Sequence, residues 1–166
     1  MQAAVVDALP TSDVLIMAAA PADYRPADPA QAKRPREKGA LKLLAVTVLT
    51  SFDQRNLAEM GYAGSVEDLV LQRARTALES GCDGVVASGL EAPRIKAAFG
   101  QKLLVVTPGV RPAGAAAADQ KRTVDVAQAF ANGADYIVVG RPIRDAADPR
   151  AAAEAIQASI AAAFRD

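Results

Sequence analysis

The sequence contains no histidine, no tryptophan and a single cysteine, Cys82, among its 166 residues. Without histidine, a Ser-His-Asp triad and the usual zinc sites are excluded, and we expect neither a metal nor a cofactor. One cysteine cannot form a disulfide within the chain, which favours a reducing compartment and predicts a cytoplasmic protein. Aromatic residues are also scarce, with four Phe and three Tyr. A core built from Ala, Val, Leu and Ile is typical of helices packed on a parallel sheet.

The sequence also has no excess of either charge and no long apolar run. The 19 basic and 19 acidic residues balance, so nothing indicates a nucleic-acid-binding surface. No apolar run approaches the ~20 residues that a membrane-spanning helix requires, and the first residues do not have the pattern of a signal peptide. We therefore expect one α/β domain over residues 1–166, with no nucleic-acid partner and no membrane partner.

From residue 41 onward, apolar strand patterns alternate with amphipathic helix patterns. Ser65 gives one helix a capping-box-like start, and Asp148 followed by Pro149 gives the last helix a cap. This alternation requires parallel strands joined by right-handed crossovers. The predicted strands are 41–48, 83–88, 102–109 and 135–140, and the predicted helices are 65–80, 91–100, 123–133 and 148–164.

The first forty residues have a different composition. A strand pattern at 13–19 is followed by a segment rich in Pro and charge, residues 21–39, which has no periodicity. We predict a boundary near residue 40, between an αβ fragment (1–38) and a regular part (41–166). If strand 13–19 lies beside strand 41–48, the sheet has five parallel strands in an open, flavodoxin-like or Rossmann-like sandwich. The alternative is a homodimer that pairs through open sheet edges.

Polar residues follow each predicted strand of the regular part. Parallel sheets bind ligands at the carboxyl ends of their strands, so these residues are the candidate site. Glycine lets backbone N–H groups approach a phosphate, and arginine matches a phosphate with two hydrogen bonds. The pattern predicts a phosphate-ester site, and the alternative is a turn glycine beside a solvated arginine. The residues are Thr50, Ser51, Asp53, Ser88, Glu91, Thr107, Gly109, Arg111, Asp119, Gln120, Arg122, Gly140 and Arg141.

Four of these segments, "LLAVTVLTS", "DGVVAS", "LLVVTPGVRP" with "DQKR", and "GADYIVVGRPI", resemble the carboxy-terminal half of orotidine 5′-phosphate decarboxylase, over roughly residues 41–163. The resemblance implies the last four βα units of a (β/α)8 barrel. It implies a phosphate site at Arg111, Gln120, Gly140 and Arg141, with Ser51 and Pro108 at the pyrimidine. The implied ligand is phosphate or a pyrimidine nucleoside monophosphate.

The family's catalytic network, with the motif Asp-x-Lys-x-x-Asp, has no counterpart in the 166 residues. Phosphate binding without that network does not accelerate decarboxylation, so we expect no activity from the chain alone. The segment "LPTSDVLIMAAAPADYRPADPAQAK" resembles part of a phosphopantothenoylcysteine synthetase domain, which implies nucleotide contacts at Asp23 and Lys33 and a chimeric chain. Three hypotheses remain: an inactive binding fragment, a decarboxylase completed by a second chain, and a nucleotide-binding module.

Overall fold

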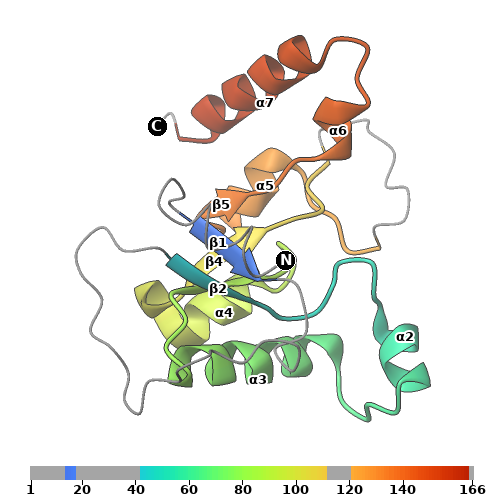
Figure 1. Cartoon of the computed structure of the whole chain (residues 1–166), viewed down its shortest axis with the longest axis vertical. Coiled ribbons are helices and arrows are strands. Elements are labelled where there is room, and N and C mark those ends of the chain that lie inside the picture. Colours follow the sequence, from blue (N-terminus) through green and yellow to red (C-terminus); the bar gives the residue numbers. More distant parts are fainter. Residues whose placement is uncertain (1–13, 18–41, 112–120, 165–166) are drawn as a thin grey trace, which may run out of the picture.

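The computed structural model describes residues 14–17, 42–111 and 121–164 (Figure 1). Five parallel strands form one sheet in the consecutive order β1-β2-β3-β4-β5. The strands are β1 (Val14–Met17), β2 (Lys42–Val46), β3 (Gly84–Val86), β4 (Leu104–Thr107) and β5 (Tyr136–Ile137). The helices are α2 (Gln54–Glu59), α3 (Val66–Glu79), α4 (Ala92–Phe99), α5 (Val126–Ala131), α6 (Arg141–Arg144) and α7 (Pro149–Ala163), with a short 3-10 helix, η3 (Gly100–Lys102).

The predicted helix ends are confirmed where a cap was read from the sequence. The Ser65 hydroxyl accepts a hydrogen bond from the Asp68 N–H at 3.1 Å, and α3 begins at the next residue. Asp148 accepts from the Ala151 N–H at 3.0 Å and caps α7. A side-chain oxygen at such a position satisfies an N–H that the first turn leaves without a partner.

Helices α2 and α6 were not predicted, because elements of six and four residues are too short to show a period of 3.6. The signal for α2 is local: Asp53 accepts from the Asn56 N–H at 3.0 Å, and the Asn56 side chain accepts from the Asp53 N–H at 3.2 Å. This reciprocal pair is a capping box. Helix α6 begins at Arg141, directly after the predicted end of the last strand.

The strand order corrects one expectation. A flavodoxin-like sandwich reverses its strand order at one point, so that right-handed crossovers place helices on both faces of the sheet. The consecutive order observed here has no reversal, so helices joined by such crossovers fall on the same face. The α/β architecture with parallel strands and flanking helices is confirmed, but the open doubly wound order is wrong. The observed order is consistent with part of a (β/α)8 barrel.

The two faces of the sheet have different surroundings. Val85 and Val105 are fully buried and belong to one hydrophobic cluster with Val70 and Ala74 of α3 and Ile95 of α4. The alternate positions point to the opposite face, since side chains alternate along a strand. That face bears an apolar cavity of about 220 Å³, lined by Lys42, Leu44, Leu104, Val106, Tyr136, Ile137 and Val138. None of the helices in the described part of the chain has the length and hydrophobicity required to span a lipid bilayer.

Two aspartates that precede strands have structural partners. The Asp83 carboxylate accepts from the Leu43 N–H at 2.6 Å. The Asp135 carboxylate accepts from the Val105 N–H at 2.7 Å and pairs with the Lys96 ammonium at 2.6 Å. Each aspartate therefore ties its own strand to a strand on one side of it. This contact gives a structural reason for an aspartate directly before an apolar run at both places.

Candidate functional site

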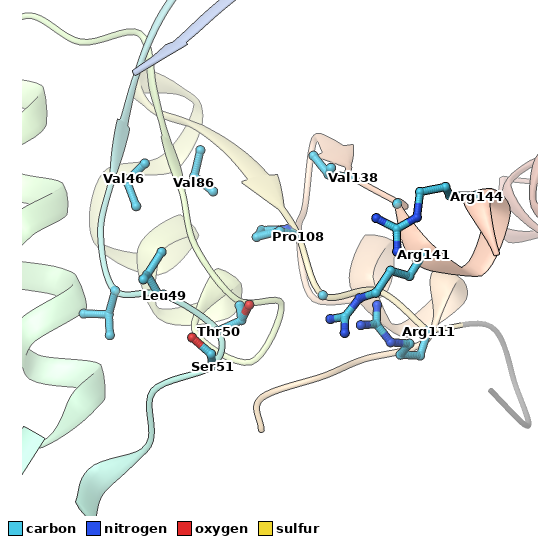
Figure 2. A pocket seen from close by; sticks show the side chains of 13 residues that line it. Val46, Leu49, Thr50, Ser51, Val86, Pro108, Arg111, Val138, Arg141 and Arg144 are labelled. Atoms are coloured by element: carbon cyan, nitrogen blue, oxygen red, sulfur yellow. The ribbon is translucent and has the colours of Figure 1, made fainter. Parts of the chain in front are cut away.

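A cleft of about 490 Å³ lies where strands β2 to β5 end. Its apolar floor is formed by Val46, Val86 and Val138, which lie at or just after the ends of their strands (Figure 2). The rest of the wall comes from the segments that follow β2, β4 and β5, as expected for a site at the carboxyl edge of a parallel sheet. These remaining residues are Val48, Leu49, Thr50, Ser51, Pro108, Gly109, Arg111, Gly140, Arg141 and Arg144.

The cleft has a basic side and an uncharged polar side. In Figure 2 the guanidinium groups of Arg111 and Arg141 point toward the turn that carries Thr50 and Ser51, with Pro108 between the two sides. Arginine side chains converging on one space favour an anion, and phosphate geometry suits their paired N–H donors. The hydroxyl-bearing turn opposite offers hydrogen bonds to an uncharged part of the same ligand.

Arg144 is paired with a neighbouring carboxylate. It forms two hydrogen bonds with the carboxylate of the neighbouring Asp145, at 2.6 and 2.9 Å. This contact raises the pKa of Arg144 and holds the pKa of Asp145 below its usual range. Among the described residues, the Arg111 side chain makes one hydrogen bond, from Nη1 to the carbonyl of Val110 at 3.0 Å, which leaves further N–H donors on its guanidinium. Because the guanidinium groups of Arg111 and Arg141 point toward the same space, we expect them to hold a ligand anion there (Figure 2).

The two glycines of the cleft, Gly109 and Gly140, differ in backbone conformation. Gly109 has a φ of 73°, which lies in the left-handed region that side chains disfavour. Gly140 has a φ of −101°, which other residues adopt, and a Cβ built there meets no atom within 4 Å. No neighbouring atom in the described protein requires glycine at position 140. The space beside Gly140 is therefore open, and it belongs to the cleft.

Gly140→Ala is expected to weaken ligand binding without lowering the stability of the protein. The free energy of unfolding should stay the same or rise by less than about 1 kcal/mol, because alanine fits the backbone and restricts the unfolded chain. Affinity for UMP, used as a test ligand of the phosphate-ester class predicted from the sequence, should weaken about tenfold, equivalent to about 1.4 kcal/mol, because the methyl group would occupy the space predicted for the phosphate. Urea unfolding and calorimetric titration measure the two quantities. Gly64→Ala, at another glycine with open surroundings and outside the cleft, is the matched control. An unchanged UMP affinity in Gly140→Ala would contradict this placement of the phosphate.

The structure brings most of the predicted site residues together. Ser51, Pro108, Arg111, Gly140 and Arg141 come from three separate segments and all line the one cleft. Gln120, Asp23 and Lys33 lie outside the described residues. What these residues bind stays a prediction.

One buried arrangement beside the cleft was missed from the sequence. Arg122 and Glu91 were placed after strands, yet nothing in the sequence indicated that they form a buried ion pair beside the cleft. They are separated by 31 positions, so only the packing of their loops brings them together.

Comparison with known protein families finds a match over most of the chain. Residues 2–156 match the model of the "Orotidine 5'-phosphate decarboxylase / HUMPS family". The chain belongs to this family. The orotidine 5′-phosphate decarboxylase of Methylococcus capsulatus is 59% identical over 130 residues, which cover 78% of this chain and 54% of that protein. That of Stenotrophomonas maltophilia is 58% identical over 124 residues, which cover 75% of this chain and 52% of that protein. The chain thus spans about half the length of the curated relatives it matches.

Solved structures of the family agree in fold. The crystal structure of orotidine 5′-phosphate decarboxylase from Lactobacillus acidophilus superposes with a TM-score of 0.60 at 39% identity, over 76% of this chain and 52% of that one. The family match begins at residue 2 and so includes the segment 2–36. A separate origin of that segment in a phosphopantothenoylcysteine synthetase is not supported, and the expected chimera is corrected accordingly.

Proposed function

We propose that this chain binds pyrimidine nucleoside monophosphates through the phosphate-binding and part of the base-binding surface of an orotidine 5′-phosphate decarboxylase. One observation carries the proposal: Arg111, Arg141 and Gly140 line the same cleft as Ser51 and Pro108. A phosphate between the two arginines would place the ribose and base of the nucleotide toward the Thr50–Ser51 turn. The affinity is expected to be weak, because the cleft is open and holds the ligand from one side.

The same proposal includes the absence of decarboxylation by the chain alone. Family activity relies on a Lys and Asp network that stabilises the developing carbanion, and no Asp-x-Lys-x-x-Asp motif occurs in the 166 residues. We expect the remaining groups to bind the phosphate and the base with the same strength in the ground state as in the transition state. Uniform binding of this kind lowers the concentration needed for saturation but does not raise the rate of chemistry.

Titration of UMP into isotope-labelled protein tests the binding function. Amide resonances of Ser51, Gly109 and Gly140 should shift and saturate with UMP, shift with ribose 5-phosphate, and respond less to uridine, which has no phosphate. If these resonances do not move at millimolar UMP, the proposal is wrong. Loss of orotidine 5′-phosphate absorbance above the rate in buffer would contradict the absence of decarboxylation.

A second candidate function is a decarboxylase site completed by another chain. Two observations favour it: the chain covers about half of its relatives, and Tyr136 and Val138 on the cavity-bearing face are 54% and 44% exposed. An exposed apolar sheet face favours association with a protein that covers it. Decarboxylation that appears only after mixing with the amino-terminal half of a family member would support this function. A solution mass of twice the chain mass would instead indicate the homodimer.

A further inference from the structure

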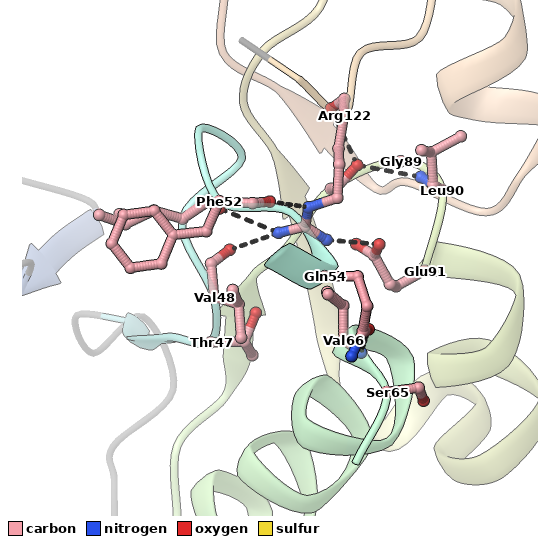
Figure 3. Close-up of polar contacts among 12 residues, drawn as sticks. Thr47, Val48, Phe52, Gln54, Ser65, Val66, Gly89, Leu90, Glu91 and Arg122 are labelled. Atoms are coloured by element: carbon pink, nitrogen blue, oxygen red, sulfur yellow. Dashed lines mark hydrogen bonds and ion pairs between the residues drawn. The ribbon is translucent and has the colours of Figure 1, made fainter. Parts of the chain in front are cut away.

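Arg122 places a guanidinium in the loops beside the cleft, where only 8% of the residue is exposed (Figure 3). Its Nε donates to the carbonyl of Phe52 at 2.8 Å. Its Nη2 donates to the carbonyls of Val48 at 3.1 Å and Leu49 at 3.0 Å. A single side chain therefore holds three carbonyls of the loop that follows β2.

The backbone next to this side chain holds the same loop. The carbonyl of Thr50 accepts from the N–H groups of Lys121 and Arg122, at 3.1 and 3.2 Å. Thr50 and Phe52 flank Ser51, so the carbonyls on both sides of Ser51 are held from residues 121 and 122. The position of the Ser51 hydroxyl in the cleft thus depends on a segment more than sixty residues away in the chain.

The carboxylate that balances Arg122 is also buried. Arg122 Nη1 donates to Glu91 Oε1 at 2.5 Å, and Glu91 is 2% exposed. Burial raises the pKa of Glu91, and the opposing effect of the Arg122 charge is smaller. Glu91 Oε2 has no hydrogen-bond partner among the described residues. An ion pair with a raised carboxyl pKa and an unsatisfied oxygen is poorly explained as a source of stability, since apolar side chains often serve as well at such places. An apolar side chain, however, cannot donate to three carbonyls.

We propose that Arg122 is a positioning residue, which fixes the Thr50–Ser51 turn opposite Arg111 and Arg141 and so sets the spacing between the base and phosphate subsites. This inference rests on the proposed function. It assigns to Arg122 an effect on the base end of the ligand, transmitted through the backbone of residues 48–52. The phosphate end of the ligand is contacted by Arg111 and Arg141 across the cleft, and we expect Arg122 to have no effect on it.

Two ligands distinguish an effect on the base end of the ligand from an effect on its phosphate end. UMP contains the base, whereas ribose 5-phosphate contains only the phosphate and the sugar. Arg122→Lys keeps a positive charge beside Glu91 but cannot reach all three carbonyls, because the N–H donors of lysine are on one nitrogen, whereas those of arginine are spread over three. We expect UMP affinity to fall about tenfold in Arg122→Lys, about 1.4 kcal/mol, while ribose 5-phosphate affinity stays within about twofold of the parent. The amide resonances of Thr50, Ser51 and Phe52 should also shift in the ligand-free variant.

Arg94→Lys is the matched control, because Arg94 makes a single exposed ion pair with Asp68 at 3.2 Å and does not line the cleft. It should change neither affinity. A double variant adds a second test: in a Ser51→Ala background, Arg122→Lys should cost much less UMP affinity, because the group that it positions is gone.

Equal weakening of both ligands, or no change in either, by a folded Arg122→Lys protein would overturn the inference. If that variant does not fold, Glu91→Gln serves instead. It leaves the carbonyl contacts of Arg122 in place and should lower stability without changing the ratio of the two affinities; a tenfold change in that ratio would also overturn the inference. Failure of the proposed function is distinct, because the parent protein would then bind neither UMP nor ribose 5-phosphate.

Discussion

Arg141→Ala is expected to weaken UMP binding by about tenfold to a hundredfold, with the fold retained. A hydrogen bond to a charged group contributes about 1.5–3 kcal/mol, and each 1.4 kcal/mol corresponds to a tenfold change in affinity. Arg141 lines the cleft at the start of α6, and its guanidinium points toward the space shared with Arg111 (Figure 2). Calorimetric or resonance-shift titration with UMP measures the loss.

Arg144→Ala is the matched control for this prediction. Arg144 lines the same cleft and lies on the same short helix, and its guanidinium forms two hydrogen bonds with the Asp145 carboxylate. Its removal should reduce UMP affinity less than threefold, on the order of 0.6 kcal/mol. An equal loss in the two variants would show that the cleft attracts anions only through its general positive charge. In that case Arg141 would have no specific role.

Gly84→Ala is expected to destabilise the protein by about 1–3 kcal/mol. Gly84 lies in β3 between two leucines of neighbouring strands, with which it is in register. A Cβ at this position would lie 2.7 Å from Leu44 Cδ2 and 2.7 Å from both the Cβ and the carbonyl oxygen of Leu104. The contact with Leu44 involves the end of a flexible side chain, whereas the contact with the Leu104 carbonyl is relieved only if the backbone of β4 moves. The midpoint of urea unfolding measures the change.

Gly140→Ala provides the comparison, since the same substitution there meets open space. The two variants are expected to affect different properties. Gly84→Ala should lower the stability of the protein, whereas Gly140→Ala should lower its affinity for UMP and keep its stability. A stable Gly84→Ala protein would mean that β3 and β4 separate more easily than this packing indicates.

Much of the local structure was predictable because its causes lie within a few residues. Ser65 and Asp148 cap their helices through N–H groups three positions away, and the apolar runs gave β2, β3 and β4 to within a few residues. The grouping of Ser51, Arg111 and Arg141 was also predictable, since residues that follow parallel strands meet at one edge of the sheet. Helix α2 was missed because a capping box over six residues is a weak signal.

The sequence by itself determined the alternation of strands and helices, the absence of histidine chemistry and the residue types gathered at the cleft. Only the tertiary structure decided the strand order and the surroundings of Arg122. Strand order depends on which strands pair across long stretches of chain, and the apolar pattern of a buried strand is the same in a sandwich and in a barrel. Arg122 and the carbonyls it holds are 70 to 74 positions apart. A contact of that kind exists only after the loops have packed, because its free energy comes from burial and geometry rather than from the identity of neighbouring residues.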